Sequence, residues 1–383
     1  MKKFVCLVLF LMVFASAFFI ACGSENDALP TEDNQPSYLY VDDYEDTDNS
    51  EEEALPSEAL DIPDAVYFAR IDLDAIDFNS MVIPTSSPHG EIGHWYVRHI
   101  SAYLPSRVPF TYRELDAALW LEQMLLAKGF DESMVHVQTF SHYDVIGLED
   151  YFDWGIPGLY DVKQQGWHDG HEARDYSQNI IVTIPGKSEQ TIIIGAHYDS
   201  LRYEGTSDNA SGVSLLMENA QRMLNQDNYY TLVYVFFGAH EIGMLGTFYF
   251  YESLTPEIRE NIVLYINADV LIEGPDLIIS TGYGFELNQN ELSQQMKSFA
   301  ELFYDTHEIM IRPLGVTGGD QLMFLYRGYT TLGLWGIDPS TFTNFLHSPR
   351  DSYEHISRRF PGMIERTMNA FALFLETILL EAF

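Results

Sequence analysis

Short apolar runs alternate along most of this chain with segments in which apolar residues recur every three to four positions. Six of the runs are dense in β-branched and aromatic residues, which is typical of strands. The runs that begin at 191, 230 and 262 are apolar on both faces, the pattern of central strands covered by helices. The predicted strands are 135–140, 179–185, 191–197, 230–237, 262–268 and 330–335.

Helical periodicity appears between these strands. Residues 111–130 place apolar side chains at helical spacing and carry a stop signal at Gly129. Because strands and helices alternate, the predicted fold is α/β, a three-layer sandwich with a largely parallel mixed central sheet flanked by helices. Residues 143–178 are rich in glycine and aromatic residues and are expected to form a long loop. Further helices are predicted at 210–225, 243–254, 288–305, 318–327 and 359–381.

The N-terminus has the pattern of a targeting segment. Lys2 and Lys3 precede an apolar stretch from Phe4 to Ala21, and Cys22 follows. This resembles a bacterial lipoprotein signal, which implies removal of residues 1–21 and a lipid on Cys22 that holds an extracytoplasmic protein on a membrane. Phe19 replaces the usual leucine, so ordinary secretion and an uncleaved membrane anchor are alternatives.

Composition divides the remainder into two parts. Residues 22–60 are expected to be a disordered acidic spacer, because few apolar residues offset the cost of ordering them. Residues 61–383 are predicted to form the globular domain. The formal net charge of −37 repels nucleic acid, which excludes that class of partner. Beyond the targeting segment and Cys22 there is no cysteine, so neither disulfides nor thiolate chemistry is expected in the domain.

Residues that commonly bind metals follow three of the predicted strands. His197 closes the strand that begins at 191, Glu241 follows the strand at 230, and Asp269 follows the strand at 262. Open α/β sheets form their sites at the carboxyl ends of strands. Asp208 and His347 are predicted to approach from loops. Each residue alone has a structural explanation, such as a turn for Asp208, but imidazole and carboxylate ligands without thiolate together suit a catalytic zinc pair.

The flanking motifs are similar to those of the zinc aminopeptidase family that includes bacterial leucine aminopeptidases, aminopeptidase Y and, more distantly, glutaminyl cyclases. The matching stretches are GAHYDS (195–200), SDNASG (207–212), FFGAHEIGMLGT (236–247), YINADV (265–270) and LHSPRDSY (346–353). The resemblance covers roughly residues 90–383. It implies a zinc-exopeptidase-like fold and hydrolysis of the first peptide bond of peptides with a free N-terminus.

The resemblance also implies a role for each matching residue. One of two zinc ions per chain would be held by His197 and Asp269, and the other by Glu241 and His347. Asp208 would bridge them. The other implied roles belong to Asp199, which would orient His197, and Asn209, which follows the bridging residue, in some relatives across a cis peptide.

Position 240 departs from the family pattern. The family has Glu-Glu where this chain has His240-Glu241, and the first glutamate is the general base. Three interpretations follow. His240 is a catalytic base, since an ordinary imidazole pKa suits proton transfer near neutral pH. Alternatively, His240 is an additional metal ligand. In the third interpretation, the chain is a catalytically impaired homologue that binds peptides.

Three other classes of enzyme are alternatives to an aminopeptidase. A glutaminyl cyclase would need a single zinc on Asp208, Glu241 and His347. A carboxypeptidase would need a cation for the substrate carboxylate. Serine hydrolysis is disfavoured because the sequence contains no G-x-S-x-G. An accessory metal site in the stretch 168–172 is a minor hypothesis.

Overall fold

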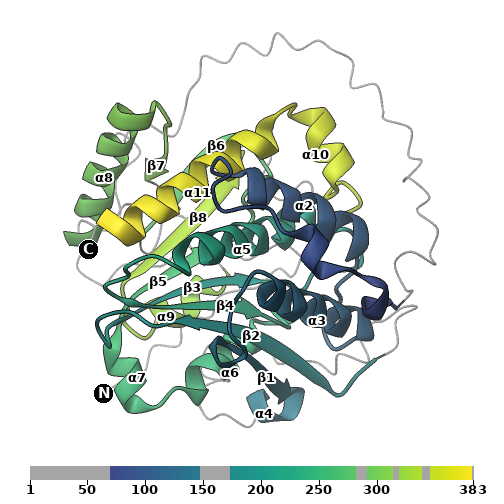
Figure 1. Cartoon of the computed structure of the whole chain (residues 1–383). Coiled ribbons are helices and arrows are strands. Elements are labelled where there is room, and N and C mark those ends of the chain that lie inside the picture. Colours follow the sequence, from purple (N-terminus) through teal and green to yellow (C-terminus); the bar gives the residue numbers. More distant parts are fainter. Residues whose placement is uncertain (1–69, 147–172, 282–290, 314–318, 339–345, 382–383) are drawn as a thin grey trace, which may run out of the picture.

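The computed structural model describes residues 70–146, 173–281, 291–313, 319–338 and 346–381 (Figure 1). Its centre is an eight-stranded sheet in the order β1-β2-β4-β3-β5-β8-β6-β7. Strands β4, β3, β5 and β8 run parallel, and β1, β2 and β6 join by antiparallel pairing. The predicted mixed, largely parallel sheet is confirmed. The strands are β1 (Val135–Ser141), β2 (Tyr176–Ile184), β3 (Thr191–His197), β4 (Thr231–Phe237), β5 (Ile262–Ala268), β6 (Asp276–Ser280), β7 (Arg312–Pro313) and β8 (Thr331–Ile337).

Helices cover both faces of this sheet (Figure 1). The longer ones are α2 (Glu91–Tyr103), α3 (Tyr112–Ala127), α5 (Ser211–Met223), α8 (Glu291–His307) and α11 (Met363–Glu381). The shorter ones are α4 (His142–Ile146), α6 (Leu245–Ser253), α7 (Pro256–Asn261), α9 (Gln321–Leu325) and α10 (Tyr353–Arg359), with single turns at Leu73–Ala75, Phe78–Met81, Glu132–Met134 and Thr206–Ala210. In the described ranges, no helix is both long enough and apolar enough to cross a bilayer.

Alternation along the central strands creates two apolar layers. In β3, Ile192 and Ile194 face the larger core, which α2, α3, α5 and α11 complete. Ile193 faces the smaller core, where Phe248 of α6 and Phe324 of α9 pack. Successive strand residues point to opposite faces, so a strand that is apolar throughout can bury both of its sides. This is the physical reason why β3 is buried along its whole length.

Several elements differ from the sequence prediction. Helix α2 was not predicted, although Ile92, Tyr96 and Ile100 recur every four residues and are buried. Strands β6 and β7 were also missed, because runs of five and two residues carry little periodicity. The expected long loop at 143–178 was wrong at both ends, where α4 and β2 enter it. Residues 147–172, with the proposed accessory site, lie outside the described residues.

Candidate metal centre

The ends of three neighbouring strands bring four of the predicted site residues together. His197 is the last residue of β3, His240 and Glu241 follow β4, and Asp269 follows β5. Strand β3 pairs in parallel with both β4 and β5, so these ends share one edge of the sheet. These side chains therefore gather at the carboxyl edge of the sheet, where the site was expected.

Asp208 lies between two imidazole rings. Its Oδ1 is 3.1 Å from Nε2 of His197, and its Oδ2 is 3.0 Å from Nε2 of His347. The same Nε2 of His197 is 3.4 Å from Oδ1 of Asp269, and the same Nε2 of His347 is 3.0 Å from Oε2 of Glu241. The structure thus brings all five predicted ligands into two groups that share Asp208.

Backbone contacts fix Asp208 between these groups. The Asp208–Asn209 peptide bond is cis. The Asn209 side chain donates to the carbonyl oxygen of Ala268 at 2.9 Å and accepts from the N–H of Gly212 at 2.9 Å. The carboxylate of Asp351 accepts two successive backbone N–H groups, the second from Asp208 at 3.1 Å. The loop is consequently tied both to the end of β5 and to the segment that carries His347.

Left-handed backbone occurs beside several of these side chains. Ala239, Val270 and His347 have φ angles of 54°, 51° and 57°. Such angles are unfavourable for residues other than glycine, and they concentrate at functional sites where the surrounding structure enforces them. Ala239 directly precedes His240, and Val270 directly follows Asp269.

Asp199 was expected to orient His197, and the contact is looser than that role implies. The Asp199 carboxylate is 3.7 Å from Nδ1 of His197, whereas the main-chain oxygen of Asp199 is 3.1 Å away. The carboxylate instead accepts the backbone N–H groups of His240 and Glu241, each at 3.0 Å. Asp199 therefore holds the turn after β4 in place and reaches His197 chiefly through its backbone.

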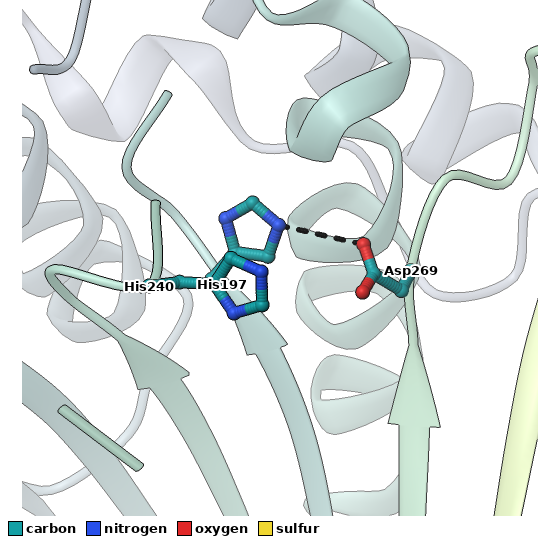
Figure 2. A group of neighbouring side chains, drawn as sticks. All are labelled: His197, His240 and Asp269. Atoms are coloured by element: carbon teal, nitrogen blue, oxygen red, sulfur yellow. Dashed lines mark ion pairs between the residues drawn. The ribbon is translucent and has the colours of Figure 1, made fainter. Parts of the chain in front are cut away.

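His240 lies flat against His197. The two ring centroids are 3.8 Å apart and the ring planes differ by 9° (Figure 2). Nδ1 of His240 is 3.0 Å from Oδ1 of Asp320, a buried residue directly before α9. Within each of two groups of three side chains, the potential ligand atoms lie within 4.8 Å of one another. The groups are His197, His240 and Asp269, and Asp208, Glu241 and His347.

Negative charge dominates the electrostatics of this centre. Burial opposes the charged form of His347, but Glu241 and Asp208 outweigh it and raise the pKa of His347 to about 11. Burial likewise opposes a charged His197, yet Asp199, Asp208 and Asp269 raise its pKa well above the usual range. The carboxylates therefore favour positive charge at the centre, whether it is carried by protons or by metal ions.

A second, independent observation indicates that these residues fit a metal site. Nε2 of His197, Oδ1 of Asp269 and Oε1 of Glu241 are buried and make no hydrogen bond in the described structure. Buried polar atoms are normally paired, so a cluster of such atoms directed into one space calls for a missing partner. Imidazole nitrogens and carboxylate oxygens without thiolate are the ligands of catalytic zinc.

Sequence reasoning missed several residues that support the centre. Glu114 accepts from the backbone N–H of Ala239 at 3.1 Å, and its pKa is raised to about 8, first by burial and then by the charge of Asp199. Arg107 is buried and donates to four backbone carbonyls, one of which belongs to Tyr198. Neither residue lies in a recognised motif, so no sequence signal connected them to the site. The remaining missed residues are Asp351 and Asp320.

These features define an α/β protein with a carboxylate- and histidine-rich centre at the carboxyl edge of its sheet. The family model named Peptidase family M28 matches residues 179–372, which is just over half of the 383-residue chain. The chain belongs to peptidase family M28. The expected family resemblance is confirmed.

Individual relatives agree with this assignment. Aminopeptidase YwaD of Bacillus subtilis (strain 168) is 29% identical over 196 residues, which are 48% of this chain and 41% of that protein. The chain spans about half the length of the curated relatives it matches.

Solved structures show the same fold. A zinc aminopeptidase from Bacillus subtilis superimposes with a TM-score of 0.58 at 16% identity, covering 76% of this chain and 95% of that one. A glutaminyl cyclase from an Acidobacteriales bacterium gives 0.55 at 17% identity, covering 78% and 97%. At these identities the likeness concerns the fold.

The role of Asp199 leads to a first prediction. In Asp199→Asn, only one side-chain oxygen remains to accept from the backbone of His240 and Glu241, and the new amide faces a donor. We expect the free energy of unfolding to fall by about 1–3 kcal/mol, measured by urea denaturation, and zinc affinity to fall about 10-fold or more, measured by chelator competition. The surface variant Asp305→Asn on α8 should change neither. Unchanged stability and zinc affinity in Asp199→Asn would contradict the role.

Proposed function

We propose that this chain is a metallo-aminopeptidase that hydrolyses the N-terminal peptide bond of peptides. The observation that carries the proposal is the position of Asp208, whose two oxygens face His197 in one group of candidate ligands and His347 in the other. One carboxylate shared in this way is suited to a pair of metal ions rather than to one. Membership of peptidase family M28 supports the reaction class.

Two zinc ions per chain are part of the proposal. His197 and Asp269 would hold the first, Glu241 and His347 the second, and Asp208 would contact both. When bound, such a pair polarises the scissile carbonyl and makes water a competent nucleophile near neutral pH. In this assignment Asp199 supports the centre by fixing the backbone of Glu241.

The proposed substrates are peptides with a free N-terminus. The pocket beside the centre opens over Asp208, Glu241 and His347, with Leu201 and Tyr203 in its wall. Its lining within the described residues holds three acids and no lysine or arginine. A carboxypeptidase needs a cationic side chain for the terminal carboxylate, and the described lining of this pocket supplies none, which favours an aminopeptidase.

His240 is proposed as the catalytic base of this reaction. Its Nδ1 is 3.0 Å from Oδ1 of Asp320. In this assignment the imidazole accepts a proton from the attacking water and returns it to the leaving amine.

A glutaminyl cyclase is the main rival, because a solved cyclase shares the fold. A single zinc on Asp208, Glu241 and His347 would leave His197 and Asp269 without a role. Nε2 of His197 and Oδ1 of Asp269 lie 3.4 Å apart, and both atoms are buried without a hydrogen bond. This arrangement supports the two-zinc peptidase instead.

The activity test is cleavage of a panel of aminoacyl-p-nitroanilides by the purified chain. We expect cleavage, fastest for apolar first residues, which a chelator abolishes and added zinc restores. Conversion of an N-terminal glutamine peptide to its cyclic product, without cleavage of the panel, would favour the cyclase. If a folded, zinc-loaded chain does neither, the result would favour a peptide-binding homologue without catalysis.

We further propose that the protein is exported and held on a membrane through lipid on Cys22, with residues 22–60 as a spacer and 61–383 as the peptidase domain. The supporting features are the two lysines, the apolar stretch and the cysteine at its end. In a bacterial host, labelled palmitate should enter the protein, and Cys22→Ala should abolish that labelling. Cys6→Ala is the matched control and should retain it. Label in Cys22→Ala would refute the anchor.

A further inference from the structure

Exposed arginines gather on the outer helices α2 and α10 of a chain whose formal net charge is −37. Arg358 and Arg359 end α10, and Arg350 lies shortly before that helix. Arg98 of α2 joins them, because its Cζ is 5.8 Å from the ring centroid of Tyr353, the first residue of α10. The two helices are in contact (Figure 1). We call Arg98, Arg350, Arg358 and Arg359 the arginine patch.

Positive charge dominates around His355 of α10, although acids lie nearby. Burial and then the charges of three patch residues lower the pKa of His355: Arg350, Arg359 and Arg358. Glu354 pairs with Arg358, and Glu365 lies 3.5 Å from His94. The side chains of Glu354 and Arg358 are 54% and 62% exposed, and ion pairs at such exposure contribute little. The patch can therefore exchange this partner for another carboxylate.

We propose that the arginine patch is a docking surface for the acidic segment of the same chain that precedes the described domain. Residues 25–64 contain 15 aspartates and glutamates, and no lysine or arginine lies between Lys3 and Arg70. The segment and the patch are therefore complementary in charge, and their attraction is strongest at low ionic strength. Docking would hold the domain in one orientation, which goes beyond the role of a spacer. The inference does not depend on the proposed peptidase function.

The described chain begins close to the patch. Arg70 pairs with Asp116 of α3 at 2.6 Å, and the N–H of Ile71 donates to the same carboxylate at 3.0 Å. Asp116 is buried, so this contact fixes the start of the domain on α3. Helix α3 packs against α2, where the ring centroids of Trp120 and Tyr96 lie 6.1 Å apart. The acidic segment therefore joins the domain one helix away from the patch.

The acidic segment is long enough to reach the patch. Glu51, Glu52 and Glu53 lie 17 to 19 positions before Arg70. A chain of that length spans up to about 55 Å when extended, whereas α2, with 13 residues, is about 20 Å long. A segment on such a short tether is present at about millimolar effective concentration. Ion pairs that are weak one by one are then sufficient to hold it.

An anionic membrane surface is the alternative partner for a basic patch. The net charge of the whole chain opposes its approach to such a surface. The acidic segment needs no approach, because it is already attached to the domain. The segment of the same chain is therefore the favoured occupant.

The first test measures energy transfer between two dyes on the full chain. Cys6→Ala and Cys22→Ala remove both cysteines of the sequence, so the dyes attach only to introduced ones. One dye is placed at Ser50→Cys and the other at Ala102→Cys, an exposed position one turn beyond Arg98 on α2. A second pair, at Ser50→Cys and Asp305→Cys on α8, serves as the reference.

The sign of the salt effect decides between a docked and an undocked segment. If the segment is docked, transfer in the 50/102 pair should fall about twofold or more between low salt and about 1 M salt, where the Debye length is about 3 Å. An undocked acidic chain would instead contract as its self-repulsion is screened, and its transfer would rise in both pairs. Transfer in the 50/102 pair that rises or stays constant would overturn the proposal.

A charge exchange tests which residues attract each other. Arg358→Glu/Arg359→Glu should reduce the low-salt transfer of the 50/102 pair toward its high-salt value, and Glu51→Lys/Glu52→Lys/Glu53→Lys should do the same. The chain that combines all five substitutions should regain most of the lost transfer. Lys297→Glu, at an exposed position on α8, is the matched control and should leave the transfer unchanged. A combined chain that regains nothing would contradict the pairing.

Two further measurements separate the remaining partners. Transfer should not change on dilution of the protein, whereas a loss on dilution would place the acidic segment on a second copy and overturn the proposal. Vesicles of phosphatidylglycerol provide the membrane arm. Sedimentation with these vesicles that Arg358→Glu/Arg359→Glu abolishes, without any effect of the same substitutions on transfer, would assign the patch to a membrane surface instead.

Discussion

The enclosure of several carboxylates at one edge of the sheet is the constraint on which the rest of this structure depends. Asp199, Asp208 and Asp320 are all nearly or fully buried. Buried charges are costly unless they are paired and hydrogen-bonded. The chain meets this cost with backbone N–H donors, as at Asp199, and with imidazole, as at Asp208. The negative charge that these groups do not compensate favours positive charge at the centre, which a pair of metal ions would supply.

This constraint also gives the histidine at position 240 a physical explanation. A site already crowded with carboxylates accommodates an imidazole more readily than a further acid, since an imidazole adds no negative charge. Burial opposes the charged form of His240, but Asp320, 3.0 Å away, outweighs it and raises the pKa of His240 to about 9.

Much of the fold could be predicted from sequence, because the central strands are apolar on both faces and the helices between them are periodic. Strands β3, β4 and β5 were found within one residue of their ends. The segments that were not predicted are short or polar, as β7 is, or combine aromatic and histidine residues, as α2 does. Local periodicity carries little information about such segments.

The candidate ligands could be named from sequence because strand ends and motif spacing place them, and the structure brings all five together. Beyond Asp199 and Asn209, the residues that support these ligands could not be named. Asp320 reaches His240 from a point eighty positions further along the chain, and Glu114 reaches the same turn from α3. Neither contact leaves a local pattern. The looser contact of the Asp199 carboxylate with His197 was equally invisible, since it depends on where the turn after β4 lies.

The central claim is that Asp208 joins two metal ions. Anomalous diffraction at the zinc edge, from crystals of the zinc-loaded chain, tests it most directly. We expect two peaks, one bounded by His197, Asp269 and Asp208 and the other by Glu241, His347 and Asp208. A single peak that Asp208 does not share with a second ion would contradict it.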